Sequence, residues 1–193
     1  MRTTKMLSVA GLAVFALMAS IGAASAGARQ VNLADGTTVA PNGTTFTSSG
    51  NATLDNGTLV NTCDMSIPGT LTDNGSTGND LTADVSPVFS NCDFATTGNA
   101  EPWVLDLTQA GNPGHVIGVD VTINAFGVNC EFAGDTVEVT WTNGAPSTVD
   151  LSGTLPLVSG PSFLCGSTGS VSGSVTIDTT SDGGNNFIID PAP

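Results

Sequence analysis

The side chains able to do chemistry in this chain are carboxylates, one histidine and four cysteines. The sequence holds 17 Asp and Glu but three Lys and Arg. The histidine, His115, follows a Gly-Asn-Pro-Gly run typical of a turn, and no G-x-S-x-G elbow surrounds any serine. Paired carboxylates could act on a glycoside, but abundance alone does not define a pair. We therefore expect His115 to be a loop residue and the protein not to be an enzyme, with no catalytic residues.

Two acidic turns offer the hard oxygen ligands that Ca²⁺ prefers. One runs from Asp73 to Asp80 and the other from Asp178 to Asp182. Neither matches the twelve-residue calcium loop, because the closing Glu is missing from both. Ordinary acidic turns explain the same residues, so these four aspartates are candidates for a Ca²⁺ site and no other cofactor is indicated.

The cysteines indicate two disulfides. Neighbouring cysteines are 29 or more positions apart, which disfavours the close pairs of a zinc site. Three pairings are open. A weak internal repeat favours Cys63–Cys92 and Cys130–Cys165, because each half shows Cys-acid-apolar, then a strand-like run, then Pro-x-Phe before the second Cys. Disulfides of this kind are typical of an oxidising compartment.

Aromatic side chains are few, at 5% of residues with no Tyr. Trp141 shares the parity of Val137 and Val139, which predicts a core position. Trp103, in the run Glu101-Pro102-Trp103-Val104-Leu105, is the candidate surface aromatic. A single exposed ring is a poor platform for carbohydrate stacking.

The elements that must position these residues are strands. Val119, Val121 and Ile123 alternate with polar or small neighbours, as β-branched residues do in half-buried strands. Asn-Gly and Asp-Gly turns separate many such runs. This pattern is shared by antiparallel sandwiches, jelly rolls and small barrels. We expect an all-β, antiparallel β-sandwich or jelly-roll-like domain with two disulfides over residues 51–193.

The N-terminus has the three parts of a signal peptide over residues 1–26: a basic start, an apolar middle and an Ala-Ser-Ala cleavage site. Residues 27–50 then form a polar segment, read either as peripheral strands or as a loosely ordered leader. Cleavage predicts a secreted, extracellular or cell-surface protein without a later membrane segment. Arg29 would then be the one Lys or Arg facing 17 acids, a side-chain charge of −16, which excludes nucleic acid as a partner.

From Pro102-Trp103-Val104, with the cysteine spacing and the Thr/Gly/Ser-rich background, the chain resembles small secreted bacterial proteins of the PraB-type protein activator of alkane oxidation family. The resemblance implies an extracellular, non-enzymatic factor for growth on hydrocarbon, acting at hydrophobic or cell surfaces, and it defines no site residues. The alternative is a structural or adhesive subunit of the cell surface or of a fibre. Such a subunit would bind copies of itself by strand addition or with Ca²⁺.

Overall fold

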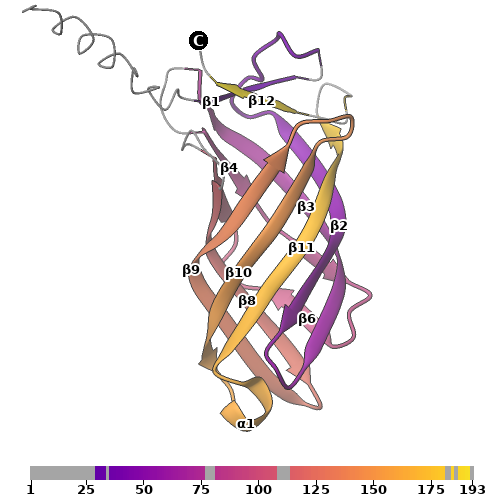
Figure 1. The fold of residues 1–193 in the computed structure, drawn as a ribbon, viewed down its shortest axis with the longest axis vertical. Coiled ribbons are helices and arrows are strands. Elements are labelled where there is room, and N and C mark those ends of the chain that lie inside the picture. Colours follow the sequence, from indigo (N-terminus) through magenta and orange to yellow (C-terminus); the bar gives the residue numbers. More distant parts are fainter. Residues whose placement is uncertain are drawn as a thin grey trace, which may run out of the picture.

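The structure is a computed structural model that describes residues 29–33, 35–76, 81–107, 114–180, 184 and 187–191. These residues form twelve strands and one short helix (Figure 1). The elements are β1 (Arg29–Asn32), β2 (Thr45–Asp55), β3 (Val60–Asn74), β4 (Leu81–Val85), β5 (Val88–Ser90), β6 (Ala95–Gly98), β7 (Trp103–Asp106), β8 (Gly114–Ala125), β9 (Val128–Thr142), β10 (Thr148–Ser159), α1 (Ser162–Cys165), β11 (Thr168–Thr180) and β12 (Ile188–Pro191).

Eight of these strands close into an antiparallel barrel, in the ring order β2-β11-β10-β9-β8-β7-β4-β3. The ring closes because β2 pairs with β3 along its whole length, from Thr45↔Thr70 to Asp55↔Val60. The prediction of an all-β, antiparallel, two-disulfide fold is confirmed. The expectation of a sandwich or jelly roll is wrong, since the sheet curls onto itself and one face becomes the interior, instead of splitting into two packed layers.

The alternation seen in the sequence separates the inside of the barrel from the outside. Val119, Val121 and Ile123 of β8 point inward and are buried, as are Val137 and Val139 of β9. The intervening Thr, Ser and Asp side chains form the outer wall. The barrel is therefore filled by apolar side chains and presents a polar surface, the arrangement that hydrophobic burial favours in water.

The two ends of the described chain meet in a second, two-stranded sheet, in which β1 pairs with β12. This sheet lies across the barrel end opposite α1 (Figure 1). Phe187, just before β12, is buried and packs edge-to-face on Phe46 of β2, with ring centroids 5.6 Å apart. The hydroxyl of Ser147 donates a 2.7 Å hydrogen bond to the carbonyl of Phe187. These contacts close that end of the barrel.

The sequence predicts segments over residues 1–26, 27–50 and 51–193, and the strands show where these boundaries fall. Residues 1–26, the predicted signal peptide, lie outside the described residues. The boundary after residue 50 falls inside β2, whose residues 45–50 are hydrogen-bonded to both β11 and β3. The end of the polar N-terminal segment is thus part of the barrel wall. The strand-addition alternative, which relies on that segment, draws no support from this placement.

Candidate functional site

Two of the barrel strands are short, and this leaves a gap in the wall. β4 pairs with β3 from Gly69 to Asn74, and β7 pairs with β8 from His115 to Ile117. Toward the α1 end, β3 and β8 extend well beyond the residues that pair with β4 and β7. The gap between them is filled by residues 86–102, which connect β4 to β7 and contain β5 and β6. We call residues 86–102 the cover segment.

The cover segment is attached to both sides of the gap. β5 pairs with β3, from Asp64↔Ser90 to Ser66↔Val88, and β6 pairs with β8, from Ala95↔Asn124 to Gly98↔Val121. Within the described residues, ladders join every neighbouring pair of strands in the ring, whereas none joins β5 to β6, and the β9–β10 ladder is interrupted between Ser152↔Glu138 and Leu157↔Phe132.

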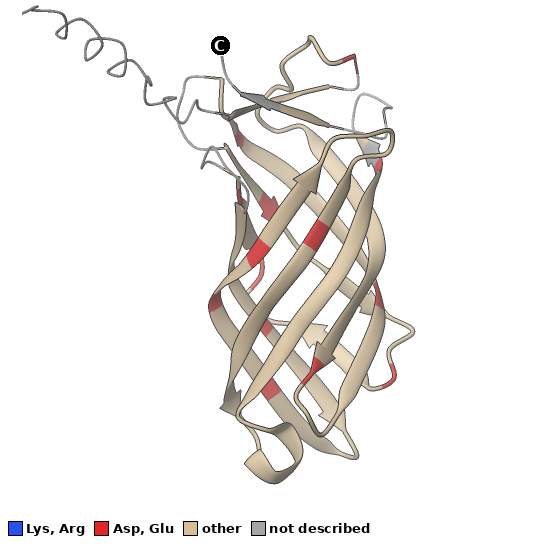
Figure 2. Ribbon diagram, in the orientation of Figure 1, with Lys and Arg blue, Asp and Glu red and all other residues tan. Residues whose placement is uncertain are grey.

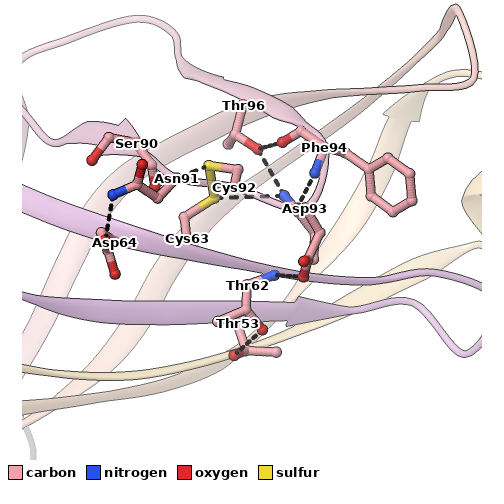
Figure 3. Close-up of a disulfide and its surroundings, with 11 residues drawn as sticks. Thr53, Thr62, Cys63, Asp64, Ser90, Asn91, Cys92, Asp93, Phe94 and Thr96 are labelled. Atoms are coloured by element: carbon pink, nitrogen blue, oxygen red, sulfur yellow. Dashed lines mark hydrogen bonds between the residues drawn. A yellow bond between two sulfur atoms is a disulfide. The ribbon is translucent and has the colours of Figure 1, made fainter.

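Besides the β3–β5 ladder, a disulfide and several hydrogen bonds hold the cover segment against β3 (Figure 3). Cys92 is bonded to Cys63. Asp93 donates its N–H to the carbonyl of Thr62 at 3.2 Å, and its carboxylate accepts the N–H of Thr62 at 3.0 Å. The amide of Asn91 donates to the Asp64 carboxylate at 2.7 Å. The fourth bond, from Phe94, involves a buried asparagine.

That asparagine, Asn61, connects β3 to the cover segment through its side chain. Its carbonyl oxygen accepts the N–H of Phe94 at 2.8 Å, and its amide nitrogen donates to the hydroxyl of Thr96 at 2.7 Å. Asn61 is 2% exposed. A buried amide is tolerated when both its ends are hydrogen-bonded, so Asn61 is a structural tie and its polar atoms are already engaged.

Behind the cover segment the barrel contains a cavity of about 80 Å³. Its lining is almost wholly apolar and includes Met65, Trp103, Val121, Leu155 and Val171. Unfilled space in a core costs roughly 24 cal/mol per Å³, so a void of this size corresponds to about 2 kcal/mol. An apolar cavity also gives water no hydrogen-bond partners and stays dry.

The prediction that Trp103 is a surface aromatic is wrong. Its side chain is 7% exposed and lines the cavity. Its indole N–H donates to the carbonyl of Asn99 at 2.9 Å, which satisfies the one polar atom of the ring. Trp141, expected in the core, is partly buried and packs against it.

The barrel end that carries α1 is the second notable feature. It is formed by residues 56–60, 126–130 and 157–168, which we call the barrel tip. The Cys130–Cys165 disulfide and a 3.4 Å hydrogen bond from Asn56 to the carbonyl of Leu164 join the three segments. None of them contains a charged residue. Figure 2 shows the acidic residues along the barrel wall and none on α1 or the turn beside it.

Four large apolar side chains are exposed on the barrel tip. Phe126 and Phe163 are 78% and 82% exposed, and Val60 and Val158 are also more than half exposed. Phe126 and Gly127 form the two-residue turn between β8 and β9, with φ of 54° and 78°. Turns with two positive φ values favour Asn-Gly. A phenylalanine at that position is strained and solvent-exposed, so local stability does not explain it.

Phe126 was not predicted to be a surface residue. The signal was present, because a Phe-Gly pair stands between two strongly alternating runs where Asn-Gly is the preferred turn. Phe163 was noticed only as part of the Pro-x-Phe repeat. Without the tertiary structure, nothing showed that the two rings lie at the same end of the barrel.

The candidate calcium ligands are not brought together among the described residues. Asp80 and Asp182 lie outside those residues. Asp73 accepts the N–H of Gly75 at 2.9 Å, as in an ordinary Asx turn, and Asp178 is exposed on β11. No group of three or more His, Cys, Asp or Glu placed to hold a metal occurs in the part of the chain that the structure describes.

His115 lies within β8, one residue after its start, and not in a loop. Its neighbours across the ladders are Asp106 on β7 and Glu138 on β9. This places it on the outer wall, away from the cavity. No free thiol accompanies it, since all four cysteines are in disulfides.

One carboxylate has a perturbed pKa. The pKa of Asp35 is lowered to about 2, because the hydroxyl and N–H of Thr38 and the N–H of Thr37 donate hydrogen bonds to the charged form. Asp35 follows β1, at the end opposite the barrel tip. A lowered pKa favours the folded state above the unfolded pKa, and this contribution is lost as the pH falls toward 2. This contribution to stability belongs to the two-stranded sheet of β1 and β12 and not to the candidate site.

Within the described residues, no helix has the length and apolar character needed to span a bilayer. Comparison with curated proteins and with solved structures gives no match. A family model described as "Alkane oxidation protein activator PraA/PraB-like" matches residues 1–183, nearly the whole chain. The resemblance seen in the sequence is thereby confirmed, and this disulfide-bonded barrel belongs to the PraA/PraB-like family of alkane oxidation protein activators.

Proposed function

We propose that this protein is a secreted, non-enzymatic factor that supports alkane oxidation by adsorbing to hydrocarbon–water boundaries through its barrel tip. The family supplies the link to alkane oxidation. The two disulfides are compatible with a location outside the cell. The observation that carries the proposal is the gathering of four exposed apolar side chains on three segments that contain no charged residue and are bordered by Asp55 and Glu131.

The rest of the molecule suits a particle that stays dispersed in water while one end touches oil. The outer wall is polar and carries the acidic residues (Figure 2). Like-charged walls repel one another, which opposes aggregation through the exposed tip. Exposed apolar patches bounded by polar surface are typical of sites that bind another surface. The charge distribution therefore orients the molecule, with the tip toward oil and the wall toward water.

The test is the interfacial tension between hexadecane and water in a pendant drop. We expect the purified, processed protein to lower this tension, and the double variant Phe126→Asn/Phe163→Ser to lose roughly half of the effect, since it removes two of the four apolar side chains. Asn accepts the positive φ of position 126, so the variant keeps its turn. Ile117→Thr, which removes an exposed apolar side chain from the wall, is the matched control and should retain full activity.

Equal tension curves for the wild type and the double variant would contradict the proposal. So would a wild-type curve no steeper than that of an unrelated protein of similar size and acidity. Circular dichroism of each variant checks that the strand content is unchanged.

A further inference from the structure

We infer that the cavity inside the barrel is a binding site for one unbranched, uncharged alkyl chain, which reaches it between β5 and β6. This inference deepens the proposed function, since it gives the protein a way to hold hydrocarbon molecules as well as to touch their surface. The residues that line the cavity are not those of the barrel tip, so the two ideas can fail separately.

The chemistry of the lining restricts the ligand class. Apolar side chains from all eight barrel strands and the cover segment surround the cavity. Of the polar side chains there, Asn61 and Thr96 are hydrogen-bonded to each other and to the backbone, and the hydroxyl of Thr53 is paired with that of Thr62. No buried side-chain nitrogen or oxygen among the described residues lacks a partner. A ligand that needs hydrogen bonds would lose those it makes with water and gain none, so the site favours hydrocarbon.

The size of the cavity favours a slender molecule. At about 80 Å³ it is about half the size of the engineered cavity of roughly 150 Å³ that binds benzene, so it holds only a few carbons of a chain unless the lining side chains move. An unbranched chain is narrower than a ring and can thread between side chains. Met65, which lines the cavity, is unbranched and flexible and adapts its shape at low cost. We therefore expect linear alkanes to bind in preference to rings.

Charge excludes the nearest competitor, a fatty acid. Beyond residue 28 the chain holds Arg29 as its one Lys or Arg, against 17 acids. Arg29 lies in β1, at the barrel end opposite the tip. A carboxylate head group would therefore find no cation near the cover segment and would be repelled by the acidic wall. A neutral alkane suffers neither penalty.

The cover segment provides the route. β5 and β6 lack a connecting ladder, and Phe89 and Thr96 from these strands line the cavity. Phe94, between the two strands, packs edge-to-face on Phe126 of the barrel tip, with ring centroids 5.3 Å apart. Phe94 is partly buried against the core, so apolar side chains continue from the tip to the edge of the core. A chain taken from oil at the tip has an apolar path inward.

The experiment uses Trp103 as an internal reporter, because it lines the cavity whereas Trp141 does not. The processed protein carrying Trp141→Phe is titrated with n-octane, and the fluorescence of Trp103 is followed. We expect a saturable change, absent after Ala52→Leu, which fills the cavity, and retained after Ala95→Leu, the same substitution on the exposed face of β6. Cyclooctane and sodium octanoate, tested in parallel, should bind more than tenfold more weakly than n-octane.

A linear, non-saturating response to n-octane in the wild type would overturn the inference. So would equal affinity for n-octane and octanoate, which would indicate a lipid-binding site instead. If Ala52→Leu fails to fold, Val171→Met adds volume to the same cavity and should weaken binding. The interfacial tension of Ala52→Leu should equal that of the wild type, and Phe163→Ser, which leaves the Phe94–Phe126 contact in place, should keep its n-octane affinity, so that failure of one proposal leaves the other intact.

Discussion

At the scale of single residues, Asn61 shows how a polar group is kept inside an apolar barrel. Its amide accepts from Phe94 and donates to Thr96, so one side chain crosses from β3 to the part of the wall that has no ladder. Phe126 presents the opposite case, an apolar ring in water at a backbone position that favours Asn. Stability accounts for Asn61, whereas Phe126 gains one ring contact, with Phe94, at a strained and solvent-exposed position.

Asn61→Ala should destabilise the protein by about 2 to 3 kcal/mol, because the N–H of Phe94 would be left without its acceptor. The free energy of unfolding is measured in urea, together with hydrogen exchange at Phe94, which should become faster. Asn124→Ala is the control: its amide bonds to Asn129 on the exposed face of the barrel, so the loss should stay below about 0.5 kcal/mol. A similar loss for both variants would show that Asn61 is not a special tie.

At the scale of elements, each disulfide fastens an inserted piece to a long wall strand. Cys63–Cys92 joins the cover segment to β3, and Cys130–Cys165 joins the α1 region to β9. The inserted pieces are short, with little core of their own. Covalent attachment compensates for this, since closing a loop of about 30 residues stabilises by roughly 3.5 kcal/mol through the unfolded chain.

Removing either disulfide should therefore lower the free energy of unfolding by a similar amount, but the two variants should differ in where hydrogen exchange becomes faster. Cys63→Ser/Cys92→Ser and Cys130→Ser/Cys165→Ser should each lower stability by about 3.5 kcal/mol. Hydrogen exchange of residues 86–102 should accelerate strongly in the first variant and little in the second. Equal acceleration in both would contradict the view that Cys63–Cys92 holds the cover segment in place.

At the scale of the whole molecule, negative charge strongly exceeds positive charge. Cleavage after residue 26 would leave 17 acids and one Arg, so self-repulsion opposes the compact state and ion pairs offer little compensation. Burial, the closed hydrogen-bond network and two disulfides must supply the stability. The same charge keeps separate molecules apart while the tip stays exposed.

Raising NaCl from about 0.01 M to about 0.5 M should therefore raise Tm by a few degrees, because it shortens the Debye length from roughly 30 Å to a few Å. Differential scanning calorimetry measures the shift. CaCl₂ at equal ionic strength serves as the comparison: an extra rise specific to Ca²⁺ would revive a site at Asp73 or Asp178, and no rise with NaCl would refute the repulsion argument.

The sequence by itself determined the class of fold, the strands and the family. Alternation of β-branched residues dictates strands with one buried face, and that information is local. The same alternation suits a sandwich and a barrel, because each strand has one inward face in both. The closure of β2 onto β3 is a long-range pairing and was decided only by the tertiary structure.

The candidate sites were decided in the same way. Trp103 lies inward with Leu105 and Leu107, whose parity it shares, but the strand is short, and its place between β4 and β8 is known only from the structure. Phe126 and Phe163 are far apart in the chain and share one end only because the barrel brings two strand connections together. Local sequence patterns determine what each strand buries; the ring order of the strands determines which exposed side chains meet and where the wall is left without a ladder.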